Sequence, residues 1–439
     1  MAPIPPHARH ADVLRLYRFH LRQVVSPLTE DLDVGIPARG LHGEEYHGRV
    51  FWDEAPAITW LSQAFPSTAR SALDYRHRRL DTARQEAHRL RCSGARYPWQ
   101  SGSKGTETTV PWVKNPLSGR WQSDHTALQQ HVGASIAHSV ARYAHHSGDI
   151  TYLHTKGAAM ICEIAQFYST RSTEDVRTGR YHLKSVVGPD AFHDMLPNSS
   201  TPGVDDNAYT NIAAASTLHL AAGLWHSLSD RRRGALTEAT GLDASDVGAW
   251  EHISRRMFVP FHNGVISQFA GYHLLTHVTL ENLADRYGND LGRLDRLMEK
   301  DGDHPRNYQI AKQADVLMLP STLSSERRAS TLSRLGYDAS SDLWQRTVNY
   351  YLKRTVHGST LSNIAHATAL REIGHPQAQH YLDLAFQTDL RDGQRTGYGI
   401  HLGAMSAVLG LAYEIAHDSN RCSTPTAQTS HKSVSDGPV

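Results

Sequence analysis

Apolar residues recur along most of this chain at steps of three and four, the spacing that places them on one face of an α-helix. The clearest case is residues 125–146, in which Leu128, Val132 and Ile136 share a face. The same spacing predicts further helices over residues 158–170, 208–228, 341–354 and 380–390. Strand-like segments are few, and only residues 264–269 have the pattern of a short hairpin arm.

Many helices of medium length, joined by polar loops, exclude a parallel-sheet fold and predict an all-α architecture of stacked helix pairs. Periodicity does not distinguish a closed toroid from an open solenoid. Residues 1–10 contain three prolines, and residues 419–439 are polar, so we expect both ends to be disordered. Residues 11–418 contain no linker and predict a single domain.

Composition narrows the class of protein. The 439 residues are 39% hydrophobic and 20% charged, as in a globular protein, and the net charge of +1 favours neither nucleic acid nor an anionic membrane as partner. No apolar run reaches the roughly 18–20 residues that span a bilayer, and the first residues lack a signal-peptide pattern. We therefore expect a cytoplasmic protein with a small-molecule substrate. The scattered cysteines and histidines predict no metal site.

Polar and aromatic residues gather in the breaks between the predicted helices. Four such breaks contain FWDE (51–54), YPWQSG (97–102), GPD (188–190) and HGST (357–360). Tryptophan faces suit the C–H surfaces of pyranose rings, and carboxylates and amides bind their hydroxyls, so these loops predict a pocket for a polar ligand. The alternative is that the aromatic residues only pack the loops together.

Taken in order, these segments resemble glycoside hydrolase family 65, which comprises the maltose, trehalose and kojibiose phosphorylases and related hydrolases. The resemblance runs from residue 41 to about residue 411. The segments that carry it are HGRVFWDE (47–54), DYRHRRLDTARQEAHRL (74–90), GARYPWQSGS (94–103), LQQHVGASIAH (128–138), GPDAFHD (188–194), VDDNAYTN (204–211), ISRRMFVPF (253–261), AKQADVLML (311–319), RTVHGSTLS (354–362) and GIHLGAM (399–405).

The resemblance implies that residues 11–418 form an (α/α)6 barrel. Typical members carry a large β-sandwich before the barrel, whereas this chain begins almost at the barrel. We therefore expect the sandwich to be absent, and a homodimer is one option for the assembly. The resemblance also implies no cofactor, with inorganic phosphate as co-substrate if the enzyme is a phosphorylase.

Family roles transfer to matching positions. The FWDE segment and the KQ pair hold the sugar, through groups whose charges and amides bind hydroxyls well. The candidate substrate-binding residues are Trp52, Asp53, Trp99, Glu107, Lys312 and Gln313. The HGSTLS and GIHLG segments border the place where phosphate or water attacks. The candidates for that anion pocket are His357, Ser359, Thr360, Tyr398 and His401.

The expected acid catalyst is missing. Inverting cleavage needs a carboxylic acid that protonates the leaving oxygen. In this family it is the glutamate of GPDE(Y/F)H, and here that position is Ala191. Three neighbours are candidate substitutes: Asp190, Asp206 and His193, whose imidazole has an ordinary pKa of about 6.5.

A second carboxylate is also missing. Hydrolytic relatives read AEGIHLG, whose glutamate is a candidate base, where this chain has Tyr398, a phenol with an ordinary pKa of about 10. A deliberate replacement of a catalytic glutamate would explain Ala191 alone, whereas natural divergence explains both departures with one cause.

Three functions remain open. The first is an α-glucoside hydrolase or phosphorylase acting on trehalose, maltose or kojibiose. The second is a repurposed lyase, cyclase, isomerase or transferase, with acid–base candidates Asp53, Asp190, Asp206, Lys312 and His401. The third is a sugar-binding protein without catalysis. A glucosyl fluoride, whose leaving group needs no proton, separates the first from the third.

Overall fold

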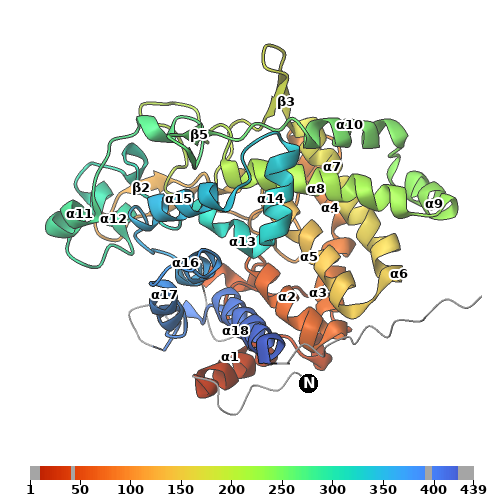
Figure 1. Ribbon diagram of the computed structural model, residues 1–439, viewed down its shortest axis with the longest axis horizontal. Helices are drawn as coiled ribbons and strands as arrows, with labels where there is room; N and C mark the ends of the chain where they lie inside the picture. The colour runs from red at the N-terminus through yellow and green to blue at the C-terminus, as the bar shows by residue number, and fades with distance from the viewer. Residues whose placement is uncertain (1–9, 41–44, 391–397, 424–439) are drawn as a thin grey trace, which may run out of the picture.

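The computed structural model describes residues 10–40, 45–390 and 398–423. Helices dominate this part of the chain, and three two-stranded antiparallel hairpins complete it. Figure 1 shows the helices arranged around a central group, with α9, α11 and α12 at the periphery. None of the helices found within these residues is long and apolar enough to cross a membrane.

An inner ring of helices closes on itself. Its members are α2 (Glu54–Ala64), α5 (Val132–Ser147), α8 (Ala208–Ser227), α13 (Leu319–Thr322) with the 3₁₀ turn η7 (Asp315–Met318) before it, α16 (Thr360–Glu372) and α18 (Leu402–Ser423). Each contacts the next in chain order, and α18 returns to contact α2. The ring is therefore a closed toroid rather than a solenoid, which confirms the predicted (α/α)6 barrel.

An outer layer of helices packs on this ring. It consists of α1 (Ala11–Val24) on α18, α3 (Pro66–Arg78) on α2 and α5, α7 (Ala158–Arg171) and α10 (Ala244–Ser254) on α8, α14 (Ser325–Arg334) on α8 and α13, and α15 (Ser341–Leu352) and α17 (Ala378–Ala385) on α16. Most outer helices thus connect two consecutive inner ones along the chain.

Shorter elements decorate the barrel. They are α4 (Leu80–Arg89), α6 (Ile150–Tyr152), α9 (Asp230–Thr240), α11 (Leu280–Tyr287), α12 (Leu294–Lys300) and the hairpins β1 (Trp112–Lys114) with β2 (Trp121–Ser123), β3 (Thr173–Asp175) with β4 (Arg180–His182), and β5 (Phe261–His262) with β6 (Val265–Ile266). The strand β6 confirms the hairpin arm predicted over residues 264–269.

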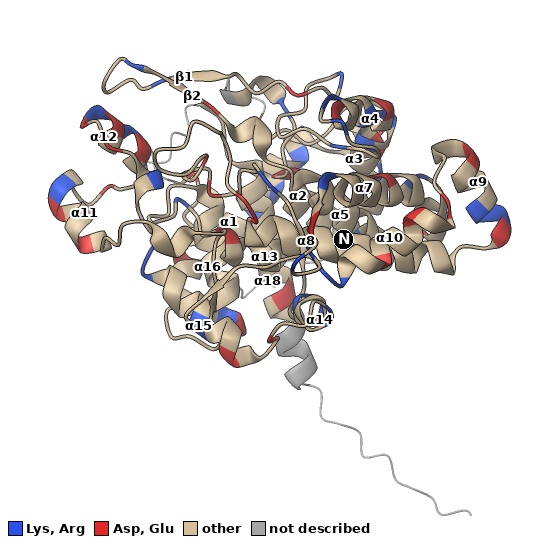
Figure 2. Cartoon of the chain, turned by 90° about the horizontal axis from the view of Figure 1, so that it is seen from above, with Lys and Arg blue, Asp and Glu red and all other residues tan. Residues whose placement is uncertain are grey.

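The two layers differ in their residues. The inner helix α8 contains no lysine, arginine, aspartate or glutamate, and Ala213, Ala214 and Ala215 are fully buried because neighbours surround the helix. By contrast, the outer helix α1 buries one stripe that includes Leu14 and Leu21. Figure 2 shows the consequence: charged residues gather on outer helices such as α9, α11 and α12.

Most predicted helices match the structure closely, as α7, α8 and α15 do. The helix predicted over residues 125–146 begins only at Val132, because Asp124 binds the amide and hydroxyl of Thr126 and starts a separate 3₁₀ turn. The helix predicted over residues 380–390 ends at Ala385, because carbonyls beyond it, at Phe386 and Thr388, accept hydrogen bonds from the Tyr17 hydroxyl.

The predicted disordered ends fall mostly outside the described residues, which omit 1–9 and 424–439. The helix α18 runs to Ser423, beyond residue 419, where we expected the tail to begin.

Candidate active site

The loops that lead into the inner helices meet at one end of the barrel. Before α2, the Trp52 ring packs against His131 at the start of α5, with ring centroids 4.8 Å apart. His131 in turn packs against Tyr209 in the first turn of α8, at 5.4 Å. Asn207, which caps α8, donates from Nδ2 to Oδ2 of Asp315 at the start of η7, 2.5 Å away.

The loops before η7, α16, α18 and α2 also contact one another. The amide of Gly358, before α16, donates to the carbonyl of Lys312, before η7, at 2.9 Å. Asp53, before α2, packs tightly on the first turn of α18. A Cβ added at Gly403 in that turn would lie 2.9 Å from the Cβ of Asp53. The positive ends of the helix dipoles therefore converge where most of the predicted site residues lie, a favourable place for anions and hydroxyl oxygens.

Aromatic rings pack against one another at this end. Trp52 is buried, and Trp99 packs against Phe51 and His131 at centroid distances of 5.0 and 5.8 Å. The sequence motif LQQHVG contains His131, but sequence reasoning did not single it out. Burial lowers the pKa of His131 to about 3, so its ring is neutral and packs as an aromatic side chain.

Asp53 lies beside a cluster of positive charge. Burial raises the pKa of its carboxyl group, and the nearby charges of His401 and Arg39 oppose that shift. The guanidinium of Arg39 also donates to the carbonyl of Gly399, at 3.1 Å, and so supports the loop that carries His401. The structure therefore brings a predicted sugar-binding carboxylate next to a predicted anion-pocket histidine.

His401 is oriented by a carboxylate that sequence reasoning missed. Its Nδ1 lies 2.7 Å from Oδ1 of Asp389, and its backbone amide donates to Oδ2 of the same side chain at 2.5 Å. The Asp389 side chain is fully buried. Because Nδ1 is engaged, Nε2 is the ring nitrogen left for a ligand. Asp389 stands outside the matching motifs, so no local pattern pointed to it.

The loop that contains Ala191 is tied by hydrogen bonds to the loop that contains Lys312 and Gln313. Asp190 Oδ1 accepts hydrogen bonds from the backbone amides of Lys312 and Gln313, the second at 3.3 Å. Its Oδ2 contacts Nδ1 of His193 at 2.8 Å and accepts from Nε2 of Gln268 at 3.0 Å. Asp190 is 1% exposed. In this arrangement Asp190 positions two loops and offers no oxygen to a ligand.

His193 is likewise engaged on both sides. Besides Asp190, its ring contacts the carbonyl of Tyr308 from Nε2, at 3.0 Å, and the residue is 3% exposed. These contacts anchor the loop on both sides of Ala191, as does the buried side chain of Phe192.

Ala191 itself is partly exposed and has a left-handed backbone, with φ of 61°. This conformation costs a residue with a Cβ about 1–2 kcal/mol, so the surrounding contacts must hold it. The methyl group at this position, where we expected the acid catalyst, has no proton to give.

Asp206, the third proposed substitute, forms a separate buried pair. Its Oδ2 lies 2.8 Å from Nδ1 of His182, and its Oδ1 accepts from Nδ2 of Asn211 at 3.0 Å. Burial raises its pKa, and the hydrogen bond and charge of His182 oppose the shift. Like Asp190 and His193, Asp206 has its polar atoms occupied within the protein.

Among the sugar-binding candidates, Gln313 and Lys312 lie at the candidate site, whereas Glu107 supports a neighbouring loop. Gln313 donates from Nε2 to the carbonyl of Pro189 at 2.7 Å, while its buried Oε1 has no hydrogen-bond partner in the structure. Burial opposes a lowered pKa at Asp295, but its hydrogen bond to Arg293, with the charges of Arg293 and then of the nearby Lys312, lowers the pKa of that carboxyl. Glu107 holds the Trp99 loop instead of facing a ligand, because it accepts from the amides of Trp99 and Gln100 at 2.9 and 3.1 Å.

The anion-pocket candidates differ in position and in burial. Ser359 caps α16 and Thr360 begins it. His357 contacts the hydroxyl of Ser362 at 2.9 Å, and burial together with the charge of His380 lowers its pKa to about 4. Tyr398 is 58% exposed, unlike the others.

The fold is thus an (α/α)6 barrel whose inner helices start at a cluster of tryptophan, carboxylate, lysine and histidine side chains, groups that suit a polar, hydroxyl-rich ligand. This chain belongs to glycoside hydrolase family 65, since residues 15–410 match the glycosyl hydrolase family 65 central catalytic domain.

Individual relatives support the same family assignment. Over 401 residues the chain is 44% identical to an uncharacterised glycosyl hydrolase of Mycobacterium tuberculosis, a match that covers 91% of this chain and 30% of that protein. Over 416 residues it is 33% identical to the trehalose 6-phosphate phosphorylase of Lactococcus lactis, covering 93% of this chain and 52% of that enzyme. The chain thus spans about half or less of these relatives.

A solved structure supports the fold. A human-microbiome protein provisionally named kojibiose phosphorylase superposes with a TM-score of 0.73 at 22% identity, covering 92% of this chain and 55% of that one. At this level of identity the likeness concerns the fold alone.

Proposed function

We propose that this chain binds α-glucosides where its inner helices begin, in a site built for inverting phosphorolysis or hydrolysis whose acid position is Ala191. The observation that carries the proposal is the close packing of Asp53 on the start of α18, beside His401. This packing places Asp53, expected to bind the sugar, next to His401, expected to border the attacking phosphate or water. The names of several relatives give trehalose 6-phosphate, kojibiose and 1,2-α-glucosylglycerol as substrates of phosphorylases.

The residues divide the work as follows. Asp53 and Lys312 hold the hydroxyls of the glucosyl ring, with Trp52 beneath them. The starts of α16 and α18, with Thr360 and His401, hold phosphate or water on the opposite face of the reacting carbon, where helix dipoles stabilise negative charge. If the attacking group is phosphate, inorganic phosphate is a co-substrate, and the proposal includes no other cofactor.

The proposed site lacks a group at position 191 that could donate a proton to the glycosidic oxygen as it leaves. An unactivated disaccharide therefore reacts slowly, because general acid catalysis contributes about 10²–10⁴-fold. α-Glucosyl fluoride avoids this step: the C1–F bond breaks, fluoride leaves with the electron pair, and an oxygen of phosphate or water bonds to C1 with inversion. The protein as it stands is expected to turn over this fluoride.

The test compares the protein with Ala191→Glu and with Ala191→Gln, which has the same shape but no acidic proton. Product analysis by NMR would use trehalose, trehalose 6-phosphate, maltose and kojibiose, with and without phosphate. Only Ala191→Glu should cleave a disaccharide, and all three proteins should turn over the fluoride. If none of them cleaves any substrate, the α-glucosidase interpretation fails.

A second candidate is a repurposed barrel that catalyses a different reaction on a sugar-like substrate. It is favoured by one observation: Asp190, Asp206 and His193 are all engaged in buried pairs, so none is a ready replacement for the acid. A protein that binds glucosides tightly while leaving the fluoride intact would support this candidate, or a purely sugar-binding role.

A further inference from the structure

A pocket lies within the inner ring of helices and extends away from the candidate active site. Its lining comes from α2, α5, the segment of η7 and α13, α16 and α18. Trp52, which precedes α2, lies at the end nearest the candidate site, whereas Glu414 lies well inside α18, which begins at Leu402. At 1.5 Å per residue, Glu414 is roughly 18 Å along the helix from that start. This axial pocket has a volume of about 120 Å³.

Apolar side chains supply much of the wall of the axial pocket. They include Ala55, Met318, Leu361, Ile364, Ala407 and Leu411. Small residues keep the space open, since a Cβ added at Gly410, which also lines the pocket, would meet nothing within 4 Å. The centre of the ring is therefore left unfilled at this depth.

The hydroxyl groups in the wall are engaged inside the protein. Thr59, Thr368 and Ser406 each donate to the carbonyl four residues earlier in their own helix, at 2.9, 2.9 and 2.7 Å. Ser321 donates to the carbonyl of Met318 at 2.6 Å, and Thr322 shares a hydrogen bond of 2.7 Å with the hydroxyl of Tyr209. These hydroxyls are already paired, so the carbon atoms around them determine what the pocket accepts.

The charges in the wall balance each other. Among the described lining residues, the charged ones are Arg142 and Glu414. Arg142 donates from Nη1 to the carbonyl of Ser321 at 3.0 Å. Burial lowers its pKa to about 10, and interactions with Tyr209 and then with Glu414 oppose that shift. One cation and one anion leave no net charge that would attract a phosphate or a carboxylate.

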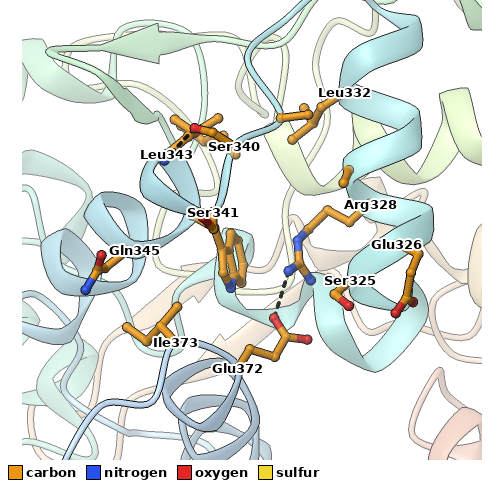
Figure 3. A pocket seen from close by; sticks show the side chains of 14 residues that line it. Ser325, Glu326, Arg328, Leu332, Ser340, Ser341, Leu343, Gln345, Glu372 and Ile373 are labelled. Carbon is orange, nitrogen blue, oxygen red and sulfur yellow. Dashed lines mark hydrogen bonds and ion pairs between the residues drawn. The ribbon is translucent and has the colours of Figure 1, made fainter.

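A larger cavity, of about 530 Å³, lies in the outer layer between α14, α15 and the end of α16 (Figure 3). An ion pair lies in its wall, because Arg328 donates from Nη2 to Oε2 of Glu372 at 2.7 Å, and Figure 3 shows these side chains pointing toward each other. The hydroxyl of Ser340 there is bonded to Asp338 and to the amide of Leu343. This outer cavity provides a comparison for the axial pocket.

The axial pocket suits an apolar molecule better than water or a sugar. An ordered water needs about two to four polar partners, which the paired hydroxyls of this wall supply poorly. A sugar has the same need at each of its hydroxyls. In other proteins, apolar cavities of about 150 Å³ stay dry and bind benzene, so a pocket of about 120 Å³ has room for one small ring.

We propose that the axial pocket is a binding site for a small apolar molecule, aromatic or short aliphatic, which lies in contact with Trp52. The inference goes beyond the proposed function, and its test can succeed or fail independently of any cleavage.

The experiment is calorimetric titration of the whole protein with toluene, with glycerol as a small polar molecule for comparison. The blocking variant is Gly410→Leu, whose side chain enters the open space of the pocket. The matched control is Gly223→Leu, at an exposed glycine of α8 where an added Cβ also meets nothing within 4 Å. We expect saturable binding of toluene but not of glycerol. Gly410→Leu should weaken toluene binding at least tenfold, and Gly223→Leu should leave it unchanged.

Further variants test the place and the chemistry of binding. Ala329→Leu, in the wall of the outer cavity, should leave the affinity for toluene unchanged. Thr368→Val replaces a hydroxyl of the axial pocket by a methyl group, so the affinity for toluene should stay the same or rise up to about threefold. Ala407→Leu blocks the pocket from another position of α18 if Gly410→Leu does not fold, which circular dichroism shows.

The proposal is overturned if toluene shows no saturable binding to the unmodified protein. It is equally overturned if glycerol binds as tightly as toluene, or if the folded blocking variant binds toluene as the unmodified protein does. Binding that Ala329→Leu abolishes would place the ligand in the outer cavity, and binding that Thr368→Val weakens would show a polar ligand site.

Discussion

The Asp389 carboxylate contacts His401 at two points: the ring Nδ1 at 2.7 Å, and the backbone amide, which donates to it at 2.5 Å. The carboxylate is fully buried, and the histidine it holds lies directly before the helix α18, beside Asp53. A ring fixed in this way presents Nε2 in a defined direction and with a defined tautomer. Asp389 is therefore a positioning residue of the candidate site.

This relationship predicts the behaviour of Asp389→Asn. The amide nitrogen of asparagine must face one of the two N–H donors, so one hydrogen bond is lost and the ring is no longer held. We expect turnover of α-glucosyl fluoride to fall roughly ten- to a hundredfold, as for loss of a charge-assisted hydrogen bond. Kinetics at varied phosphate would show the loss in KM for phosphate. An equal fall at saturating phosphate, with KM unchanged, would contradict a positioning role.

Glu107 should contribute to stability rather than to sugar binding directly. Its carboxylate accepts hydrogen bonds from backbone amides of the Trp99 loop and from Arg96, whose side chain is 7% exposed. Glu107→Ala would leave the two backbone amides without their acceptor, whereas Arg96 keeps the carbonyl of Ala127 and the carboxylate of Glu86, so the free energy of unfolding should fall by about 1–3 kcal/mol. Urea unfolding measures this, with Glu238→Ala on the exposed face of α9 as control. Equal stability of the two variants would refute the assignment.

Two glycines should respond to alanine in opposite directions. A Cβ at Gly188 would lie 2.0 Å from Oδ2 of Asp315 and 2.3 Å from Nδ2 of Asn207, so Gly188→Ala breaks the buried hydrogen bond between Asn207 and Asp315 beside the loop that contains Ala191. At Gly223 in α8 a Cβ would meet nothing within 4 Å. We expect Gly188→Ala to destabilise by about 1–3 kcal/mol and Gly223→Ala to stabilise by about 0.5–1 kcal/mol. Thermal unfolding of the pair tests both signs.

Buried histidines predict acid sensitivity. Burial lowers the pKa of His131 to about 3, and burial with the charge of His357 lowers that of His366 to about 3. Between pH of about 6.5 and 3 the unfolded chain therefore binds protons that the folded chain does not. The free energy of unfolding falls as the pH drops through this window, by about 1.4 kcal/mol per pH unit for each histidine.

The variant His366→Gln checks this sign. It should lose about 2 kcal/mol less stability than the unmodified protein between pH 6.5 and 5, as measured by urea unfolding. The exposed His145 provides the control, because His145→Gln should leave the pH dependence unchanged. A pH dependence that His366→Gln does not alter would show that this ring is protonated in the folded protein.

The amino-acid sequence by itself determined the all-helical class, several of the helices and the loops that hold the candidate site residues. Apolar periodicity located α7, α8 and α15, because a helix packed against neighbours needs apolar residues at helical spacing wherever it is covered. The ordered motifs located Trp52, Asp53, Lys312 and His401, because local patterns persist when their surroundings change. Both kinds of information are contained within short stretches of chain.

Only the tertiary structure decided how these stretches meet. Closure of the ring depends on the contact between α18 and α2, which no periodicity encodes. The partners of Asp190 lie more than 120 residues further along the chain at Lys312 and Gln313, so sequence reasoning treated a positioning carboxylate as a candidate proton donor. Hydrogen bonds to a buried carboxylate are set by three-dimensional proximity, and folding alone provides it.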